Sequence, residues 1–304
     1  MPKLMLGIVC LSIMLVMQVI PISVYATQYS LTTLDVPGSQ TTQAAGLNDG
    51  GTVVGVYDNE TKSYVLNGGS FTAVALTGAT ATRVFDVDNS GRLLGWYQDA
   101  TATHGFLLSH GAVTKLDVPG TTMTRALGSN DAGTIVGWSQ GPSGIHGFQY
   151  LNSIFSPIDV PGSTTTRAFD INPAGVIVGW FENAGGAHGF LDSGGAFTTL
   201  DVPGAINTRA IGINAAGDIV GWFENDAGDH GFVLHQGVFS IVDIPGVTKA
   251  RLFDINGSGV IVGWYQDGLA THGFVGTPVP EPASLGMVSL GLLLTVWAVK
   301  LHTS

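Results

Sequence analysis

The chain has 304 residues, of which 11% are charged, 45% are hydrophobic and 44 are glycine. So few charges and so many glycines exclude a disordered tail and a long-helix protein, and they favour a buried β protein with many turns. The formal net charge of −11 argues against a nucleic-acid partner, because an acidic surface repels the phosphate backbone. The length fits either two average domains or one large all-β domain.

Residues 1–26 have the features of a secretory signal peptide. Lys3 precedes an apolar run over residues 4–20, and the segment ends at Ala26. A basic start, an apolar helix and small residues at the end are what signal peptidase recognises and removes. The alternative is a retained N-terminal membrane anchor. Because Cys10, the single cysteine, lies in this run, the processed chain has no disulfide.

Residues 27–276 contain six copies of a unit of about 42 residues. The tetrapeptide Asp-Val-Pro-Gly begins at Asp117, Asp159 and Asp201, each 42 residues after the one before. The dipeptide Gly-Trp, the tripeptide His-Gly-Phe and a turn-leading Asn or Asp recur with the same step. A basic residue also recurs, at Arg83, Arg125, Arg167, Arg209 and Arg251. Such a period indicates a repeat architecture.

Each unit divides into four short apolar runs separated by turn residues. In the fourth unit these runs are residues 167–171, 176–181, 188–191 and 197–202. Runs of this length, rich in β-branched and aromatic residues and bounded by Gly, Pro, Asn and Asp, predict antiparallel strands. Residues 177–181 are apolar at both parities, so both faces of the sheet are expected to be buried. Four strands in about 42 residues is typical of a propeller blade.

The first and last strands of the repeat complement each other. Residues 29–36 match the fourth strand of a unit, whereas the last unit ends at its third strand, residues 272–275. We therefore predict an all-β, six-bladed β-propeller whose last blade is completed by the N-terminal strand, which leaves no open edge. The alternatives are an open β-solenoid, which requires polar caps, and a β-sandwich array.

The unit resembles the HAF family of extracellular repeats over nearly all of residues 29–276. The resemblance is carried by the His-Gly-Phe column and by the segment Asn-x-x-Gly-x-Ile-Val-Gly-Trp. It implies a secreted location and no established activity.

Three of the recurrent columns have both a chemical and a structural interpretation. The histidines of His-Gly-Phe are potential metal ligands, but we expect them to pack on or bond to the adjacent blade. Residues 86–91 look like the start of a calcium loop, yet Tyr97 stands where an EF-hand places its bidentate Glu, so a tight turn is favoured. The tryptophans of Gly-Trp are expected in the core rather than under a sugar ring. No metal site and no cofactor are predicted.

The arginine column is the candidate ligand site. If the first strand of each blade is innermost, Arg83, Arg125, Arg167, Arg209 and Arg251 gather around one mouth of the channel, where guanidinium groups would bind a carboxylate- or sulfate-bearing glycan. The alternative is that each arginine pairs with the Asp of Asp-Val-Pro-Gly, eight residues earlier, to tie neighbouring blades together.

The C-terminal segment, residues 277–304, resembles the PEP-CTERM sorting signal. It consists of Val279, Pro280, Glu281 and Pro282, then an apolar helix over residues 285–299 and a basic end. That helix is about 25 Å long, which barely spans a bilayer core. The resemblance implies recognition by an exosortase, in bacteria that have an outer membrane and make extracellular polysaccharide. The chain departs from the family in offering only Lys300 and His302 where a cluster of arginines is usual.

These observations predict an exported cell-surface or extracellular-matrix protein, held in the membrane by its C-terminal helix before processing. Its expected partners are signal peptidase, the exosortase and acidic extracellular polysaccharide. We expect a non-catalytic binding or structural platform linked to exopolysaccharide or biofilm, and no enzyme, because the polar residues recur too regularly to mark one active site. The alternative is a propeller hydrolase or lyase acting on polysaccharide.

Overall fold

The computed structural model describes residues 28–268 and 270–279, and these contain 24 β-strands and no helix. The prediction of an all-β fold is confirmed for this part of the chain. None of its segments is an apolar helix of membrane-spanning length. The predicted signal segment, residues 1–26, and the sorting segment from Pro280 onward lie outside the described residues.

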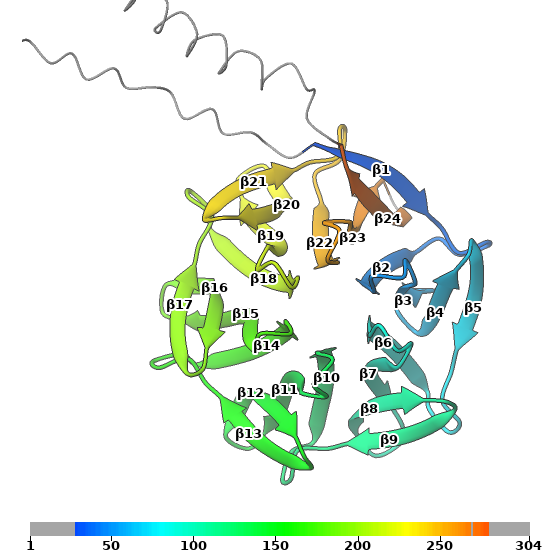
Figure 1. Cartoon of the computed structure of the whole chain (residues 1–304), viewed down its shortest axis with the longest axis vertical. Coiled ribbons are helices and arrows are strands. Elements are labelled where there is room, and N and C mark those ends of the chain that lie inside the picture. Colours follow the sequence, from blue (N-terminus) through cyan, green and yellow to red (C-terminus); the bar gives the residue numbers. More distant parts are fainter. Residues whose placement is uncertain (1–27, 269, 280–304) are drawn as a thin grey trace, which may run out of the picture.

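The strands form antiparallel groups of four, arranged around a central axis (Figure 1). The innermost strands are β2 (Thr42–Leu47), β6 (Ala81–Val87), β10 (Met123–Ser129), β14 (Thr165–Ile171), β18 (Asn207–Ile213) and β22 (Ala250–Ile255). The second strands are β3 (Val53–Tyr57), β7 (Leu93–Gln98), β11 (Ile135–Gly141), β15 (Val176–Asn183), β19 (Ile219–Asn225) and β23 (Ile261–Asp267).

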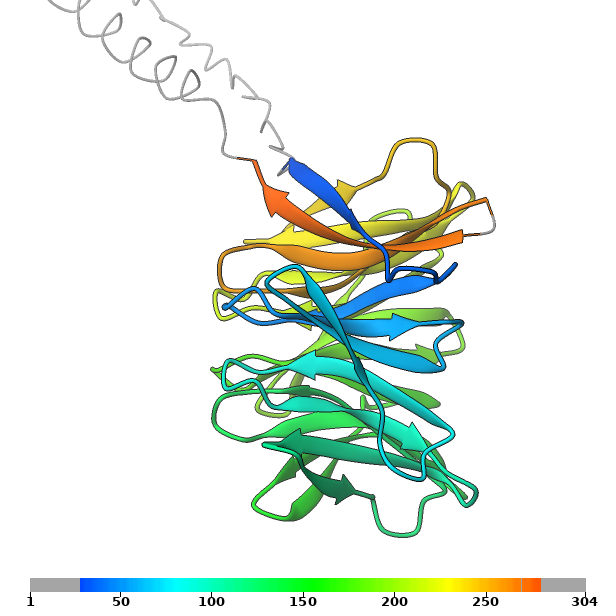
Figure 2. The same cartoon turned by 90° about the vertical axis from the view of Figure 1, so that its right-hand side faces the viewer.

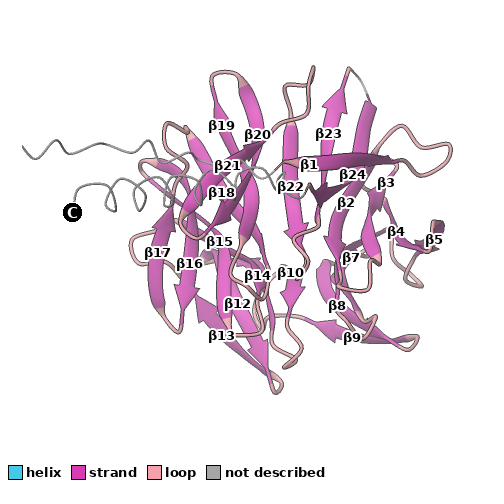
Figure 3. Ribbon diagram, turned by 45° about the horizontal axis from the view of Figure 1, so that its top comes forward, coloured by secondary structure: helices cyan, strands magenta, loops and turns pink. Residues whose placement is uncertain are grey.

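The outer two strands of each group complete the ring, with connecting loops on its two faces (Figures 2 and 3). The third strands are β4 (Lys62–Asn67), β8 (Thr103–Ser109), β12 (Gly144–Leu151), β16 (Gly186–Ser193), β20 (Gly228–His235) and β24 (Ala270–Pro278). The fourth strands are β5 (Ser70–Val74), β9 (Ala112–Leu116), β13 (Ile154–Ile158), β17 (Ala196–Leu200), β21 (Val238–Val242) and, in the last group, β1 (Tyr29–Leu34).

The N-terminal strand closes the ring as predicted. β1 runs antiparallel to β24, in register from Tyr29 opposite Pro278 to Leu34 opposite Gly273 (Figure 1). Tyr29 and Leu31 also pack against the apolar cluster between β20–β21 and β22–β24. The last group therefore joins the two ends of the described chain, and β24 pairs with a strand on each side.

The Gly-Trp and His-Gly-Phe columns are adjacent in space because the second and third strands pair through them. In the third group Gly137 lies opposite Phe148, and Trp138 lies opposite Gly147. A Cβ on Gly137 would stand 2.1 Å from the Arg125 carbonyl oxygen and 2.9 Å from the Phe148 ring. Each glycine is thus required by the close approach of the inner strand and the ring opposite it.

Apolar side chains fill the spaces between neighbouring groups, as the two-faced apolar strands predict. Each junction has its own buried cluster. The closing junction is built like the others: Ala44 and Leu47 of β2 pack with Val262 of β23. Burial of both sheet faces makes each group dependent on its two neighbours, which stabilises the ring as a unit.

Candidate functional site: an arginine mouth and an acidic channel

The arginine column lies on the innermost strands around one mouth of the central channel, and it alternates with the tryptophan column. Trp96, Trp138, Trp180 and Trp222 each lie between two guanidinium groups, with distances of 3.7–4.7 Å from the guanidinium carbon to the ring centre. Each arginine of the middle groups contacts the indole of its own group and that of the preceding one. We call this series from Arg83 to Trp264 the Arg–Trp ladder. Cation–π contact fixes the guanidinium planes before any ligand arrives.

The two end arginines of the ladder are neutralised by carboxylates. Arg83 donates to Glu60 Oε2 at 2.5 Å and, through Nε, to the Glu60 carbonyl at 2.7 Å. Arg251 donates to Asp229 Oδ2 from Nε at 2.9 Å and from Nη2 at 2.6 Å. Both carboxylates belong to the preceding group, so these ion pairs also join neighbouring groups.

The three middle arginines, Arg125, Arg167 and Arg209, form no ion pair within the described residues. The Nε atoms of Arg125 and Arg167 are buried and have no hydrogen-bond partner in the part of the chain that the structure describes. Burial, together with repulsion from Arg83 and Arg167, lowers the pKa of Arg125 to about 10. Burial likewise lowers the pKa of Arg167 and Arg209. Three guanidinium groups at this mouth are therefore bonded to no carboxylate of the described residues.

Two carboxylates border the middle arginines without bonding to them. Glu182, at the end of β15, and Glu224, at the end of β19, both act electrostatically on Arg209. Glu224 accepts a hydrogen bond of 2.8 Å from Asn207 Nδ2. Guanidinium groups therefore come from five of the six inner strands, and the carboxylates at the ends of β15 and β19 are unpaired with them.

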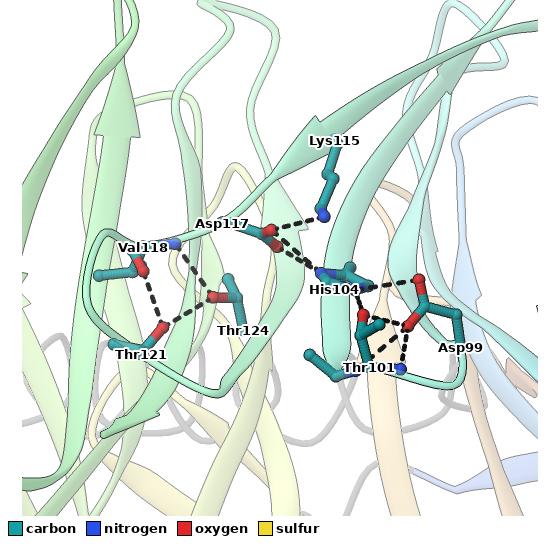
Figure 4. A network of polar contacts seen from close by, with 9 residues as sticks. Asp99, Thr101, His104, Lys115, Asp117, Val118, Thr121 and Thr124 are labelled. Carbon is teal, nitrogen blue, oxygen red and sulfur yellow. Dashed lines mark hydrogen bonds and ion pairs between the residues drawn. The ribbon is translucent and has the colours of Figure 1, made fainter. Parts of the chain in front are cut away.

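The alternative pairing of the arginines with the Asp-Val-Pro-Gly aspartates is wrong, because those aspartates bond to histidine. His104 Nδ1 lies 3.0 Å from Asp117 Oδ2, and Asp99 and Lys115 extend this network (Figure 4). The same contact recurs at His146, His188, His230 and His272.

The histidine contacts correct a second detail of the sequence interpretation. His104 bonds to the end of the fourth strand of its own group and not to the adjacent group, and its ring packs on Tyr97. The last of these contacts joins His272 to Asp35, directly after β1, so it also secures the ring closure. Among the described residues, no His, Cys, Asp or Glu cluster is arranged to hold a metal ion.

The channel behind the arginine mouth is lined by an apolar layer and then by an acidic one. Phe85, Phe169 and Phe253 alternate around the axis with Ala45, Leu127 and Ile211, and together they line a small cavity. The next residue after each phenylalanine is an aspartate, and these aspartates line both this cavity and the one at the opposite mouth: Asp86, Asp170 and Asp254. The two mouths thus differ in charge and are separated by aromatic rings.

Each aspartate of this acidic layer is held by the next group in the ring. Asp170 Oδ2 accepts from the Ile213 amide at 2.8 Å, and Asp254 Oδ2 accepts from the Leu47 amide at 2.8 Å. Asp86 Oδ2 accepts from the Ser129 hydroxyl at 2.7 Å. Burial and repulsion from Asp170 together raise the pKa of Asp86 to about 7. Burial raises the pKa of Asp170 to about 6. The side chains lie deep in the ring, yet part of each remains open to the channel.

The turn-leading column forms the opposite mouth. Asn130 Nδ2 donates to the Asn172 carbonyl oxygen at 3.2 Å, Asn172 donates to that of Asn214 at 3.3 Å, and Asn256 donates to that of Asn48 at 3.3 Å. These side chains tie each inner hairpin to the next group. The segment that resembles a calcium loop, from Asp86 onward, is one of these turns, as favoured on sequence grounds.

The acidic layer can be recognised in the sequence when alternate units are compared instead of successive ones. Phe-Asp occurs at 85–86, 169–170 and 253–254, which is every second unit, and the units between carry Gly46, Gly128 and Gly212 instead. A Cβ on Gly128 would stand 2.7 Å from Asp170 Cα. The strands converge too closely for six side chains, so glycine alternates with aspartate around the axis.

Comparison with known proteins bears on the fold. No protein-family model matches the chain, and no curated protein does. Among solved structures, a catalytically inactive virginiamycin B lyase from Staphylococcus aureus with quinupristin is 14% identical, with a TM-score of 0.50 over 83% of this chain and 100% of that one. The PQQ-bound aldose sugar dehydrogenase from Streptomyces coelicolor is 10% identical, with a TM-score of 0.50 over 83% and 98%. YCF48 bound to D1 peptide is 12% identical, with a TM-score of 0.50 over 84% and 100%. The fold is propeller-like.

These similarities correct the expectation that the chain is no enzyme. That expectation took the regularity of the repeat as a sign against catalysis, yet two of the three similar structures are enzymes, a lyase and a dehydrogenase. A regular ring positions loops from several groups at one mouth, so a regular scaffold and a catalytic site are compatible.

Proposed function

We propose that this chain is an exported surface protein whose six-bladed β-propeller binds an acidic extracellular polysaccharide at the arginine mouth. The observation that carries the proposal is the set of three guanidinium groups, Arg125, Arg167 and Arg209, that have no carboxylate partner within the described residues of an acidic protein. Guanidinium groups fixed between indoles lose little side-chain entropy when they bond to a carboxylate or sulfate.

Export and sorting complete the proposal. The N-terminal signal and the PEP-CTERM-like tail support delivery to the cell surface through signal peptidase and an exosortase, with the tail as a transient membrane anchor. The HAF-like repeat supports an extracellular location, and the link to exopolysaccharide or biofilm rests on the same resemblances.

A binding titration tests the proposed ligand. A protein of residues 27–282 is titrated with alginate, with dextran sulfate and with uncharged dextran of similar length. We expect saturable binding of an acidic polymer and none of dextran. Arg167→Gln should weaken that binding roughly tenfold or more, because a hydrogen bond to a charged group contributes about 1.5–3 kcal/mol. Arg92→Gln, whose guanidinium bonds to Asp88 at the other mouth, is the matched control. Absence of binding, or equal binding by Arg167→Gln, contradicts the proposal.

A polysaccharide lyase or hydrolase acting at the same mouth is the second candidate function. It is favoured by Glu182 and Glu224, which border the cationic groups that would hold an acidic sugar. The same incubations are assayed for unsaturated uronate by its ultraviolet absorbance and for new reducing ends. Product that disappears in Glu224→Gln would establish catalysis, and unchanged polymer length would leave binding alone.

A further inference from the structure

The Arg–Trp ladder is interrupted in the first group of strands. Gln43 and Val56 stand opposite each other there, at the positions that arginine and tryptophan occupy in every other group. Consequently Trp264 is contacted by one guanidinium group, that of Arg251, whereas each of the other four ladder tryptophans is contacted by two. Trp264 is also partly exposed, while Trp96 and Trp222 are 3% and 8% exposed.

A pocket of about 260 Å³ opens at this interruption. It is lined by both substituted side chains, by Glu60 and Asn59 of the β3–β4 loop, and by hydroxyl-bearing residues. The Glu60 carboxylate accepts a hydrogen bond of 3.1 Å from Gln43 Nε2 and another from Arg83. It therefore faces the interruption. The pocket therefore combines a carboxylate with the place where the ladder would continue.

The loop that supplies Glu60 has an unusual backbone. Asp58, Asn59 and Glu60 have φ values of 51°, 55° and 62°, three successive left-handed residues without a glycine among them. The corresponding turns of later groups use glycine at positive φ, as at Gly144 and Gly186. A left-handed conformation costs a non-glycine residue roughly 1–2 kcal/mol, and such cost is typically retained at functional sites.

Hydrogen-bonding capacity is also unused on both sides of the first group. The buried indole Nε1 atoms of Trp96 and Trp264 have no partner within the described residues. Trp96 belongs to the group after the interruption, and Trp264 to the group before it. A cationic ligand matches the Glu60 carboxylate and the indole of Trp264, which only Arg251 contacts among the described guanidinium groups.

We propose that the interruption is a binding site for a guanidinium group, an arginine side chain presented by a partner polypeptide. The guanidinium enters beside Gln43, against the Trp264 indole, and bonds to Glu60. The occupant is a guanidinium because every other gap between successive ladder indoles holds one. The net charge of −11 attracts a basic partner. This site is distinct from the middle arginines of the proposed polysaccharide site.

The test uses the full chain in mild detergent, labelled with 5-fluorotryptophan, and follows the fluorine resonance that Trp264→Phe removes. N-acetyl-arginine amide should shift this resonance with a dissociation constant on the order of 1 mM, whereas the uncharged isostere N-acetyl-citrulline amide should not. Glu60→Gln should weaken binding at least tenfold. Gln43→Arg, which supplies the missing guanidinium from the chain itself, should abolish it.

Two controls make the outcome specific. Arg167→Gln, the variant that tests the polysaccharide proposal, should bind the arginine probe as the unmodified chain does, so failure of one proposal is distinguishable from failure of the other. Equal shifts with the citrulline probe, no shift at 50-fold the expected constant, or unchanged binding in Glu60→Gln would each overturn the guanidinium site. Glu60→Gln keeps the test decisive even if Gln43→Arg does not fold.

Discussion

The acidic layer of the channel should make the ring more stable in mild acid than in mild base. Burial raises the pKa of Asp86 from an ordinary 3.8 to about 7. A carboxyl whose folded pKa lies above its unfolded value binds its proton more tightly when folded. Its contribution to stability is therefore complete below pH 3.8 and is lost as the pH rises through 7.

The size of the effect follows from that shift. The pKa shift of Asp86 is about three units, and each unit corresponds to about 1.4 kcal/mol. About two of these units are titrated between pH 5 and pH 8, so over this range Asp86 alone lowers the unfolding free energy by roughly 2–3 kcal/mol. For a domain of this size that is a fall in melting temperature of about 4–10 °C. Asp170 and Asp254, whose pKa values burial also raises, act in the same direction. Asp58 and Asp99 have lowered pKa values and act only below this range.

Thermal unfolding followed by circular dichroism at pH 5, 6, 7 and 8 measures this slope. Asp86→Asn keeps an acceptor for the Ser129 hydroxyl and removes the charge, so it should flatten the slope and raise the melting temperature at pH 8. Asp131→Asn, an exposed carboxylate at the same mouth, is the matched control and should leave the slope unchanged. If Asp86→Asn unfolds with the same pH dependence as the unmodified chain, the reasoning about the acidic layer is wrong.

Three further predictions concern how the ring is held together, and chemical denaturation measures all of them. Deletion of residues 27–38 removes the closing strand and should cost about 5 kcal/mol or more, at about 1 kcal/mol per hydrogen bond; an unchanged midpoint contradicts the closure. Gly128→Ala places a Cβ 2.7 Å from Asp170 Cα and should destabilise by about 1–3 kcal/mol; a neutral effect would show that the inner strands can separate. Asn172→Ala leaves the Asn214 carbonyl without its donor and should cost about 1–3 kcal/mol; an unchanged midpoint would show that this amide does not hold the two groups together.

Several features could be predicted because they depend on local sequence. The four strands of a unit follow from apolar runs bounded by Gly, Pro and Asn, and the closing strand follows from a spare copy at residues 29–36. The prediction that the arginines lie around the channel depends on the first strand of each unit being innermost, and Figure 1 shows that strand nearest the axis. Their partners were not predictable, because Asp117 is closer in sequence to Arg125 than to His104, and only the pairing of β8 with β9 places it beside the histidine.

The sequence alone shows which residues are equivalent, since a step of 42 residues, or 40 between the first two units, assigns each column to one place in every group. The tertiary structure decided which columns meet, because that depends on how far the strands of neighbouring groups stand apart. Near the axis they are so close that Asp86 and Gly128 must alternate. Slightly farther along the same strands there is room for four of the five ladder indoles to hold a guanidinium on each side. The interruption at Gln43 became a candidate site only when the ladder around it was visible in three dimensions.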